Sequence, residues 1–177
     1  MQDLFKYTLD IIRHDKNMTW IEDRRDDFVP LLSSNLQNLF DGKAFIVLCD
    51  EEREWFEDYI ISKINSSNRP FLLPFYKLRS LYPNFKNVKK ENFSYIDDLL
   101  NLTFQNGFCY FYIGKGSSNL SFIAKNRYDS FMWLIDENME NSFFMDGKDE
   151  FLDIKLLNLF KILDKSISGM FFNEVAL

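Results

Sequence analysis

Ala44-Phe45-Ile46-Val47-Leu48-Cys49 is followed at once by Asp50-Glu51-Glu52-Arg53-Glu54-Trp55, and this stretch decides how the chain is expected to fold. The first half is a continuous apolar run, which predicts a strand buried on both faces, as in a parallel sheet covered by helices. The second half opens an amphipathic helix. Ligands of open α/β sheets bind just beyond the carboxyl end of such a strand, so residues 50–53 are the first place to look for a functional site.

Length and composition predict one globular domain that covers residues 1–177. Apolar residues make up 46% of the chain and 20 residues are phenylalanine, which is enough for a large core. No apolar run approaches the ~20 residues that a membrane-spanning helix needs, and the N-terminus lacks the pattern of a signal peptide. We therefore expect a cytoplasmic protein that does not contact the membrane.

The charge balance disfavours direct binding to nucleic acid. The formal net charge is −6, whereas binding to a phosphate backbone needs a basic face. The nearest basic candidate is Lys86-Asn87-Val88-Lys89-Lys90, which is followed by Glu91 and is typical of a solvated loop. An acidic surface is better suited to a basic or amphipathic protein partner.

Apolar residues at helical spacing predict two helices before the first strand, over residues 4–12 and 26–40. Asp26-Asp27 is the expected N-cap of the second helix, Pro30 fits only in its first turn, and Asp41-Gly42 is expected to end it. The pattern then alternates, with helices predicted over 55–64, 91–104 and 120–125 and further strands over 70–75, 108–113, 130–135 and 142–145. This order predicts an α/β fold with a parallel sheet and helices on both faces.

The last helix, predicted over residues 151–172, is apolar around most of its circumference. A helix of this kind is buried by something on each side. In a chain of 177 residues we expect one of those partners to be a second subunit.

Two loops are candidates for a phosphate site. After the first strand, residues 50–54 contain no glycine and several carboxylates, which stabilise a helix N-terminus by roughly 0.3–1 kcal/mol each but repel phosphate. We therefore expect this helix start to be satisfied by its own side chains. The second loop, Gly114-Lys115-Gly116-Ser117-Ser118, matches neither the P-loop nor the dinucleotide-binding pattern, and a flexible surface turn is the preferred interpretation.

No residue pattern predicts catalysis, a metal site or a cofactor. His14 is the only histidine and is expected on the surface of the first helix, without a catalytic partner. Glu51 and Glu52 are acceptable general bases by position but lack a loop that holds a substrate. Cys49 and Cys109 fall in predicted buried strands, where a thiol behaves as a small apolar residue.

Several aromatic residues fall at the ends of predicted elements or in loops. They are Tyr76, Tyr82, Tyr95, Tyr128 and the pair Phe171-Phe172. Exposed aromatic residues are enriched in protein interfaces, so we expect some of this set to contact another protein.

Four pieces of the sequence carry a resemblance: WFEDYIISKIN (55–65), FMWL (131–134), LDIKLLNLFK (152–161) and FNEVAL (172–177). They resemble the HobA family, regulators of replication initiation in epsilonproteobacteria that bind the initiator DnaA. The likeness extends over nearly the whole chain and rests on extended similarity, not on a chemical signature. It implies a sugar isomerase (SIS)-like, Rossmann-type sandwich with a five-stranded parallel sheet between helices and with N-terminal helices. It also implies a homotetramer that binds the N-terminal domain of DnaA.

The resemblance also bears on the site residues. Sugar-phosphate-binding members of the SIS fold have a Gly/Ser-rich loop after the first strand, where this chain has Asp50-Glu51-Glu52-Arg53. A functionally similar adaptor of this fold has the piece Asp-Asn-Thr-Leu-Phe near its C-terminus, which matches residues 164–168 here. The implied partner-binding residues are Asp164, Ile167 and Ser168, with Phe171 and Phe172 supplying apolar area. The same residues also suit a subunit interface.

The resulting hypothesis is a non-enzymatic adaptor, a homotetramer that binds DnaA and promotes its ordered assembly at the chromosomal origin. The alternative is a sugar-phosphate-binding isomerase or sensor of the SIS fold, with a small-molecule site near residues 50–53 or 114–119. A structural oligomer with an unrelated partner is the third possibility.

Overall fold

The computed structural model describes residues 2–66, 71–84 and 92–176. The chain divides into two compact units, which we call unit 1 (Met1–Gln37 with Asp146–Leu177) and unit 2 (Asn38–Met145). The first boundary between them falls inside a helix, α2 (Arg25–Phe40). A single domain over residues 1–177 therefore stays a prediction. The basic cluster at 86–90 lies outside the described residues.

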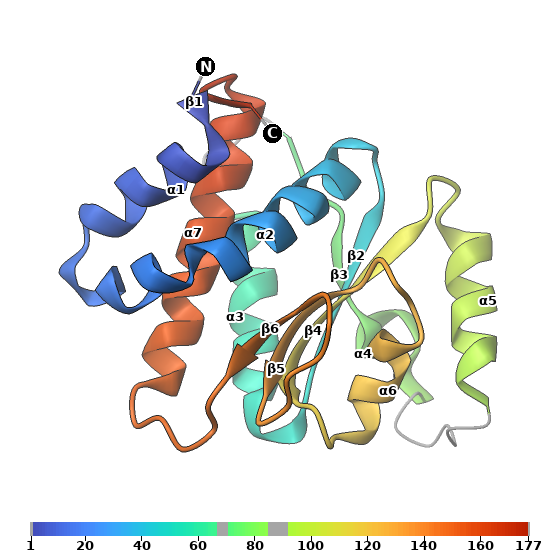
Figure 1. The fold of residues 1–177 in the computed structure, drawn as a ribbon. Coiled ribbons are helices and arrows are strands. Elements are labelled where there is room, and N and C mark those ends of the chain that lie inside the picture. The colour runs from blue at the N-terminus through green and yellow to red at the C-terminus, as the bar shows by residue number, and fades with distance from the viewer. Residues whose placement is uncertain (1, 67–70, 85–91, 177) are drawn as a thin grey trace. The chain divides into compact units, whose positions relative to one another are not determined.

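Unit 1 is built from the two ends of the chain. Besides the first part of α2, its elements are β1 (Gln2–Asp3), α1 (Leu4–Arg13), η1 (Lys16–Arg24), α7 (Leu152–Phe171) and β7 (Val175–Ala176). β1 and β7 pair in parallel, so the segments next to the two termini lie side by side (Figure 1). Two residues are too few for a periodic pattern, and the sequence does not predict this pair.

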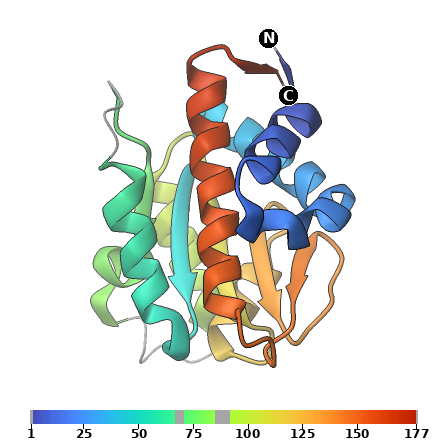
Figure 2. The same cartoon turned by 90° about the vertical axis from the view of Figure 1, so that its left-hand side faces the viewer.

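Within unit 1, α1 and η1 contact α7, drawn in red in Figure 2. Lys161 forms an ion pair with Asp15 at 2.8 Å. A Cβ on Gly169 would lie 2.8 Å from Cζ and Oη of Tyr7 and 3.0 Å from Cγ2 of Val175. Because residue 169 has no side chain, α1 and β7 approach the last turns of α7 closely, and these contacts hold that end of the helix.

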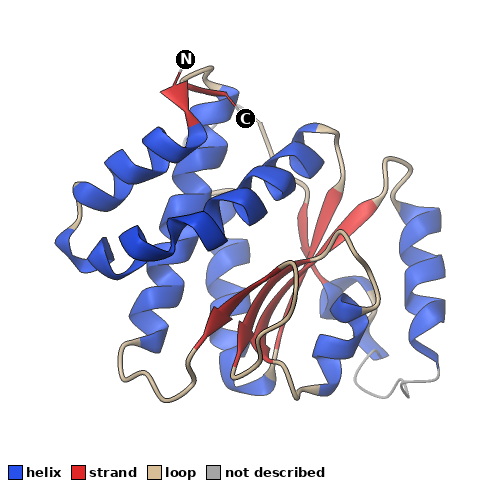
Figure 3. Ribbon diagram, in the orientation of Figure 1, coloured by secondary structure: helices blue, strands red, loops and turns tan. Residues whose placement is uncertain are grey.

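Unit 2 contains a parallel sheet with the strand order β3-β2-β4-β5-β6. Its strands are β2 (Ala44–Cys49), β3 (Phe75–Lys77), β4 (Phe108–Lys115), β5 (Phe131–Ile135) and β6 (Ser142–Met145). Its helices are η2 (Glu51–Arg53), α3 (Glu54–Ile64), α4 (Leu78–Leu81), α5 (Phe93–Thr103) and α6 (Asn119–Lys125). The prediction of an α/β fold with a five-stranded parallel sheet is confirmed (Figure 3).

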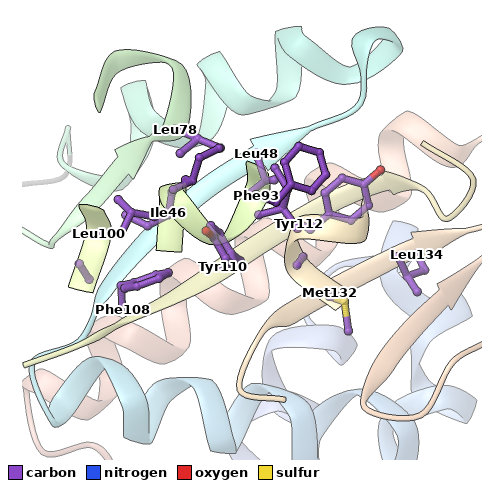
Figure 4. Close-up of a cluster of buried hydrophobic side chains, with 14 residues drawn as sticks. Ile46, Leu48, Leu78, Phe93, Leu100, Phe108, Tyr110, Tyr112, Met132 and Leu134 are labelled. Carbon is purple, nitrogen blue, oxygen red and sulfur yellow. The ribbon is translucent and has the colours of Figure 1, made fainter. Parts of the chain in front are cut away.

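Helices of unit 2 cover both faces of this sheet. On one face, alternate residues of β2, β4 and β5 pack against α4, α5 and α6, and Figure 4 shows this cluster around Ile46, Tyr110 and Met132. On the other face, Phe56 of α3 lies 6.3 Å from Trp133, measured between ring centroids. All six residues of β2 are buried, as the continuous apolar run predicts.

Several boundaries differ from the prediction, and β4 extends to Lys115, so Gly114 and Lys115 lie in the strand and not in the predicted loop. The second strand is predicted over 70–75, of which residue 70 lies outside the described residues, but β3 begins only at Phe75. The backbone of Leu73 bonds instead to the side chain of Asn65 (2.7 and 3.0 Å), and Pro74 has no N–H. The N-cap prediction for α2 is also wrong. The helix continues directly from η1 and begins at Arg25, which places Asp26 and Asp27 in its first turn and Pro30 inside it.

The apolar character of α7 is explained within one chain. Its buried apolar residues are Leu152, Leu156, Leu159, Phe160, Ile162, Leu163, Ile167 and Met170. Only Ile154 among its large apolar residues is clearly exposed, at 51%. The helix therefore does not by itself require a second subunit. Among the described residues, no helix combines the length and the apolar character needed to cross a membrane.

Candidate functional site

The strand order of unit 2 reverses between β2 and β4, and this is the place where open α/β sheets bind ligands. The residues there, which we call the switch-point cluster, are Asp50, Glu52, Arg53, Gly114 and Lys115. Asp50 follows β2 directly, and Lys115 ends the neighbouring strand. The two strands pair up to Cys49 and Ile113, so Asp50 and Lys115 meet at the same edge of the sheet.

Asp50 joins the ends of the two strands. Its Oδ2 accepts a hydrogen bond from the backbone N–H of Lys115 at 2.6 Å and another from Nη1 of Arg53 at 2.7 Å. The side chains of Asp50 and Arg53 are only 7% and 8% exposed, so the pair is buried. At the surface, Glu52 accepts hydrogen bonds from Nζ of Lys115 at 2.5 Å and from Nη1 of Arg53 at 3.3 Å. The hydrogen bond from Lys115 lowers the pKa of Glu52.

This geometry corrects the expectation that the carboxylates after β2 cap their own helix. The Asp50 side chain makes no capping hydrogen bond to a backbone N–H of η2, and the side chain of Arg53, at the N-cap position of α3, makes none to that helix either. The Asp50 carboxylate turns instead toward a residue that lies 65 positions later in the chain. Sequence spacing gives no sign of this partner, because only the pairing of β2 with β4 brings the two residues together.

The loop after β4 is tied down by internal hydrogen bonds. The backbone N–H of Gly116 donates to the carbonyl of Ile135 at 3.0 Å, and that of Ser118 donates to the carbonyl of Lys115 at 3.0 Å. The carbonyl of Gly116 accepts from Oγ of Ser121 at 2.6 Å and from Nζ of Lys125 at 2.7 Å. A phosphate loop directs free N–H groups at its anion. Here the amides of residues 115, 116 and 118 already have protein acceptors.

The other residues considered for chemistry are placed as follows. His14 is exposed at the C-cap of α1, with Nδ1 2.6 Å from the carbonyl oxygen of Asp10. Glu51 is exposed in η2. Cys49 and Cys109 are buried free thiols, and burial raises the pKa of both, that of Cys109 to about 12. Across the part of the chain that the structure describes, no group of three or more candidate ligands could hold a metal ion.

Two buried polar clusters in unit 2 are absent from the sequence interpretation. Glu57 of α3 receives two hydrogen bonds from Arg79 of α4, at 3.1 and 3.0 Å, and burial raises the pKa of its carboxyl despite this partner. Asp129, before β5, pairs with Lys43 at 3.1 Å and with Arg127 at 3.3 Å. The first was detectable, because Glu57 falls on the apolar stripe of its helix and a buried carboxylate needs a partner.

The predicted partner-binding residues all lie near the C-terminal end of α7 in unit 1. Asp164, Ser168 and Phe171 are partly exposed and recur at helical spacing, and Phe172 is 54% exposed. Oγ of Ser168 donates to the carbonyl of Asp164 at 3.1 Å. Ile167 differs from the others because it is completely buried, and it belongs to the core below this surface.

Unit 2 presents a second apolar surface. An apolar pocket of about 360 Å³, which we call the α4–α5 pocket, is lined by Leu78, Leu81, Tyr82, Ile96, Leu99, Leu100 and Thr103. Leu99 of the pocket lining also belongs to an exposed stripe on α5 with Tyr95 and Leu102, and Tyr95, Leu99 and Leu102 are 65%, 49% and 83% exposed. Of the aromatic residues expected at interfaces, Tyr76 and Tyr128 are also exposed, and Tyr82 is partly buried in the pocket wall.

Comparison with known proteins adds to this geometry. The whole chain, residues 1–177, matches the family described as HobA, DNA replication regulator. The DNA replication regulator protein HobA of Helicobacter pylori is 29% identical over 163 residues, which are 89% of this chain and 87% of that protein. A crystal structure of HobA from the same organism has a TM-score of 0.74 at 25% identity and covers 100% of this chain and 99% of its own. The structure of a HobA–DnaA (domain I–II) complex has a TM-score of 0.76 at 23% identity, with both chains fully covered, which shows the shared fold.

Proposed function

Because this chain belongs to the HobA family of DNA replication regulators along its whole length, we propose that it is a non-enzymatic adaptor for the replication initiator DnaA. The observation that carries the proposal is the match over residues 1–177. It is supported by the fold that the chain shares with a HobA crystallised together with domains I–II of DnaA. The adaptor binds the N-terminal part of the initiator in the cytoplasm, where the bacterial chromosome is replicated.

The proposed mechanism is multivalent presentation of the initiator. A closed homotetramer, as the family resemblance implies, holds several initiator domains at fixed spacing. Once one initiator domain is bound, the effective concentration of the next initiator domain at a neighbouring site is on the order of mM. The protein then promotes ordered assembly at the origin without chemistry of its own.

The proposed contact surface is the C-terminal end of α7, through Asp164, Ser168, Phe171 and Phe172. Phe172 provides exposed aromatic area, and Asp164 and Ser168 provide a polar margin along the same side of the helix. An aromatic residue with a polar rim is the usual composition of a protein-binding surface. Gly169 supports this surface, because the close approach of Tyr7 and Val175 holds the end of the helix in place.

Size-exclusion chromatography with light scattering tests the proposal, with the protein alone and mixed with the N-terminal domain of DnaA. We expect a mass above that of one chain and a complex with the initiator domain. Asp164→Asn with Phe172→Asn should weaken the complex at least tenfold and leave the unfolding transition unchanged. Tyr128→Asn is the matched control, because Tyr128 is 91% exposed in unit 2 and lies outside the proposed surface. A monomer that leaves the initiator domain unshifted contradicts the proposal.

The sugar-phosphate alternative is tested by thermal unfolding with a panel of sugar phosphates. A ligand at ~100 times its Kd adds about 2.7 kcal/mol to the free energy of unfolding, which a melting curve detects easily. We expect no shift, because the amides after β4 and the guanidinium of Arg53 already bind protein acceptors. A saturable shift with one sugar phosphate would favour an enzyme or a sensor over the adaptor.

A further inference from the structure

The carboxylate of Asp50 lies where a bound ligand is expected, although it is part of the chain. It lies just past the ends of two adjacent parallel strands, where ligands bind in this class of fold. Its Oδ2 receives the backbone N–H of Lys115 at 2.6 Å and Nη1 of Arg53 at 2.7 Å. An amide and a guanidinium are strong donors to a carboxylate, and burial strengthens both bonds.

The surroundings are shaped to admit this carboxylate. Gly114 has φ +155°, and a Cβ there would lie 2.7 Å from both Cγ and Oδ2 of Asp50. Any other residue at 114 would therefore collide with the carboxylate. Asp50 itself has φ −64° and ψ 170°, a conformation open to every residue, so its backbone does not depend on its side chain.

The covalent attachment limits how well the carboxylate fits. Oδ1 of Asp50 and Nε of Arg53 are both buried, and neither has a hydrogen-bond partner among the described residues. The carboxylate is thus held through one oxygen only. A free carboxylate of the same size could reorient between the same donors.

From this geometry we infer that Arg53 and the Lys115 amide form a binding site for a small carboxylate, which the Asp50 side chain occupies in the native protein. When that side chain is removed, the protein binds a carboxylate from solution, and this binding stabilises the folded state. Acetate is the matched ligand, because Asp50→Gly deletes a methylene and a carboxylate, which are the atoms that acetate supplies. In the native chain the tethered group has a high effective concentration and excludes added anions.

The test is urea unfolding of Asp50→Gly at pH 7 in sodium acetate and in sodium chloride of equal ionic strength. We expect Asp50→Gly to be less stable than the native protein and to gain stability saturably with acetate. At ~100 times its Kd, acetate raises the ratio of folded to unfolded protein about a hundredfold. The native protein should respond equally to the two salts.

Two variants make the result specific. Glu51→Gly deletes a carboxylate and two methylenes one residue further on, from an exposed side chain, and should show no response to acetate. Asp50→Gly with Arg53→Gln removes a donor of the site and should lose most of the response of Asp50→Gly. An equal response in Glu51→Gly, or no response in Asp50→Gly, overturns the inference.

Phosphate tests whether the site is specific for a carboxylate, because phosphate is larger than the methylene and carboxylate that Asp50→Gly deletes. Saturable stabilisation of Asp50→Gly by phosphate in preference to acetate, beyond the effect of each salt on the native protein, contradicts a carboxylate site. If Asp50→Gly does not fold in chloride, recovery of its circular dichroism spectrum on dilution from urea into acetate supports the inference, and failure to recover overturns it. The inference goes beyond the adaptor function and does not depend on it.

Discussion

The switch-point cluster and the α4–α5 pocket both belong to unit 2. They differ in whether their side chains contact other groups of the chain or the solvent. In the cluster, Asp50 binds both Arg53 and the backbone N–H of Lys115, and the side chains of Asp50 and Arg53 are each less than a tenth exposed. At the pocket, apolar side chains remain in contact with solvent, and Leu102 is 83% exposed. The fold places the cluster where a ligand is expected, whereas no rule of the fold calls for an open apolar surface on α5.

This difference supports the proposed adaptor role for a fold that is widely used to bind small molecules. Most polar groups at the ends of β2 and β4 form ion pairs and hydrogen bonds within the chain; Oδ1 of Asp50 and Nε of Arg53 are the buried exceptions in this cluster. Apolar groups on helices remain available for contact with another protein, as in other interaction surfaces. Each half of the comparison can be tested separately.

The largest effect is expected from breaking the buried pair. Arg53→Met keeps much of the length of the side chain and leaves the Asp50 carboxylate buried with only the Lys115 amide as a donor. Loss of one partner of a buried pair costs roughly 3–5 kcal/mol of unfolding free energy. Urea unfolding measures this loss.

Lys115→Met is the control for that experiment. It removes the ion pair between Lys115 and Glu52, whose side chains are 40% and 60% exposed, and leaves the backbone amide of residue 115 in place. Exposed pairs contribute little, so we expect almost no change in stability. Equal losses in the two variants would show that burial does not distinguish the two pairs.

A smaller loss is expected from Gly114→Ala. The new Cβ would lie 2.7 Å from Cγ of Asp50 and 2.8 Å from Oη of Tyr112, so the carboxylate must move. Overpacking of this kind costs roughly 1–3 kcal/mol. Gly107→Ala is the matched control, because its φ is also positive, at +83°, while the nearest atom to its Cβ is Cγ of Lys43 at 3.9 Å. If both variants lose the same stability, backbone strain explains the effect, and steric conflict between the new Cβ and the Asp50 carboxylate does not contribute.

The sequence predicts the fold well where the signal is local. The apolar run of β2 has the same bounds in the sequence and the structure, and β6 agrees as well. β3 was misplaced because its start depends on Asn65, whose side chain binds the backbone of Leu73 and keeps that residue out of the sheet. A three-residue strand has no periodicity from which to correct this.

The contacts of the candidate site were less predictable because they join distant residues. The sequence predicts that residues 50–53 do not accept phosphate, but it assigns the partners of these side chains to helix capping and does not indicate Lys115. Similarly, the family resemblance implies Ile167 with Ser168 as a contact residue, although the side chain of Ile167 is completely buried. Burial on a helix that is apolar nearly all round cannot be divided into faces from the sequence alone.

A moderate effect of pH is expected at the opposite end of β4, where Cys109 lies near Asp129. Burial raises the pKa of this thiol to about 12, whereas a thiol in an unfolded chain has a pKa of about 8.5. Between these values the unfolded chain loses a proton that the folded chain keeps. Stability therefore falls as pH rises, by up to ~1.4 kcal/mol per pH unit for this group.

Urea unfolding of the native protein and of Cys109→Ala from pH 8 to 9.5 measures this effect. Cys49 is also buried with a raised pKa and contributes a loss of the same sign, so we expect the variant to keep part of the slope. An identical slope in the two proteins would show that Cys109 ionises as readily in the folded state as in the unfolded chain. In that case, burial among partners within the chain would control the polar groups only at the switch-point end of β4.

The smallest effect on stability, and the sharpest test of the pocket, is expected from Leu99→Asn with Leu102→Asn. Both side chains are largely exposed, at 49% and 83%, so the free energy of unfolding should change by no more than about 0.5 kcal/mol per substitution. A fluorescent dye that binds apolar surface should bind the native protein and bind the double variant more weakly, because the stripe beside the pocket is lost. Ser94→Asn with Asn101→Ser is the matched control, because both positions are exposed polar residues of α5 outside the stripe. Dye binding that is absent from the native protein would mean that the pocket is covered in solution, and the contrast between a closed polar cluster and an open apolar surface would then fail.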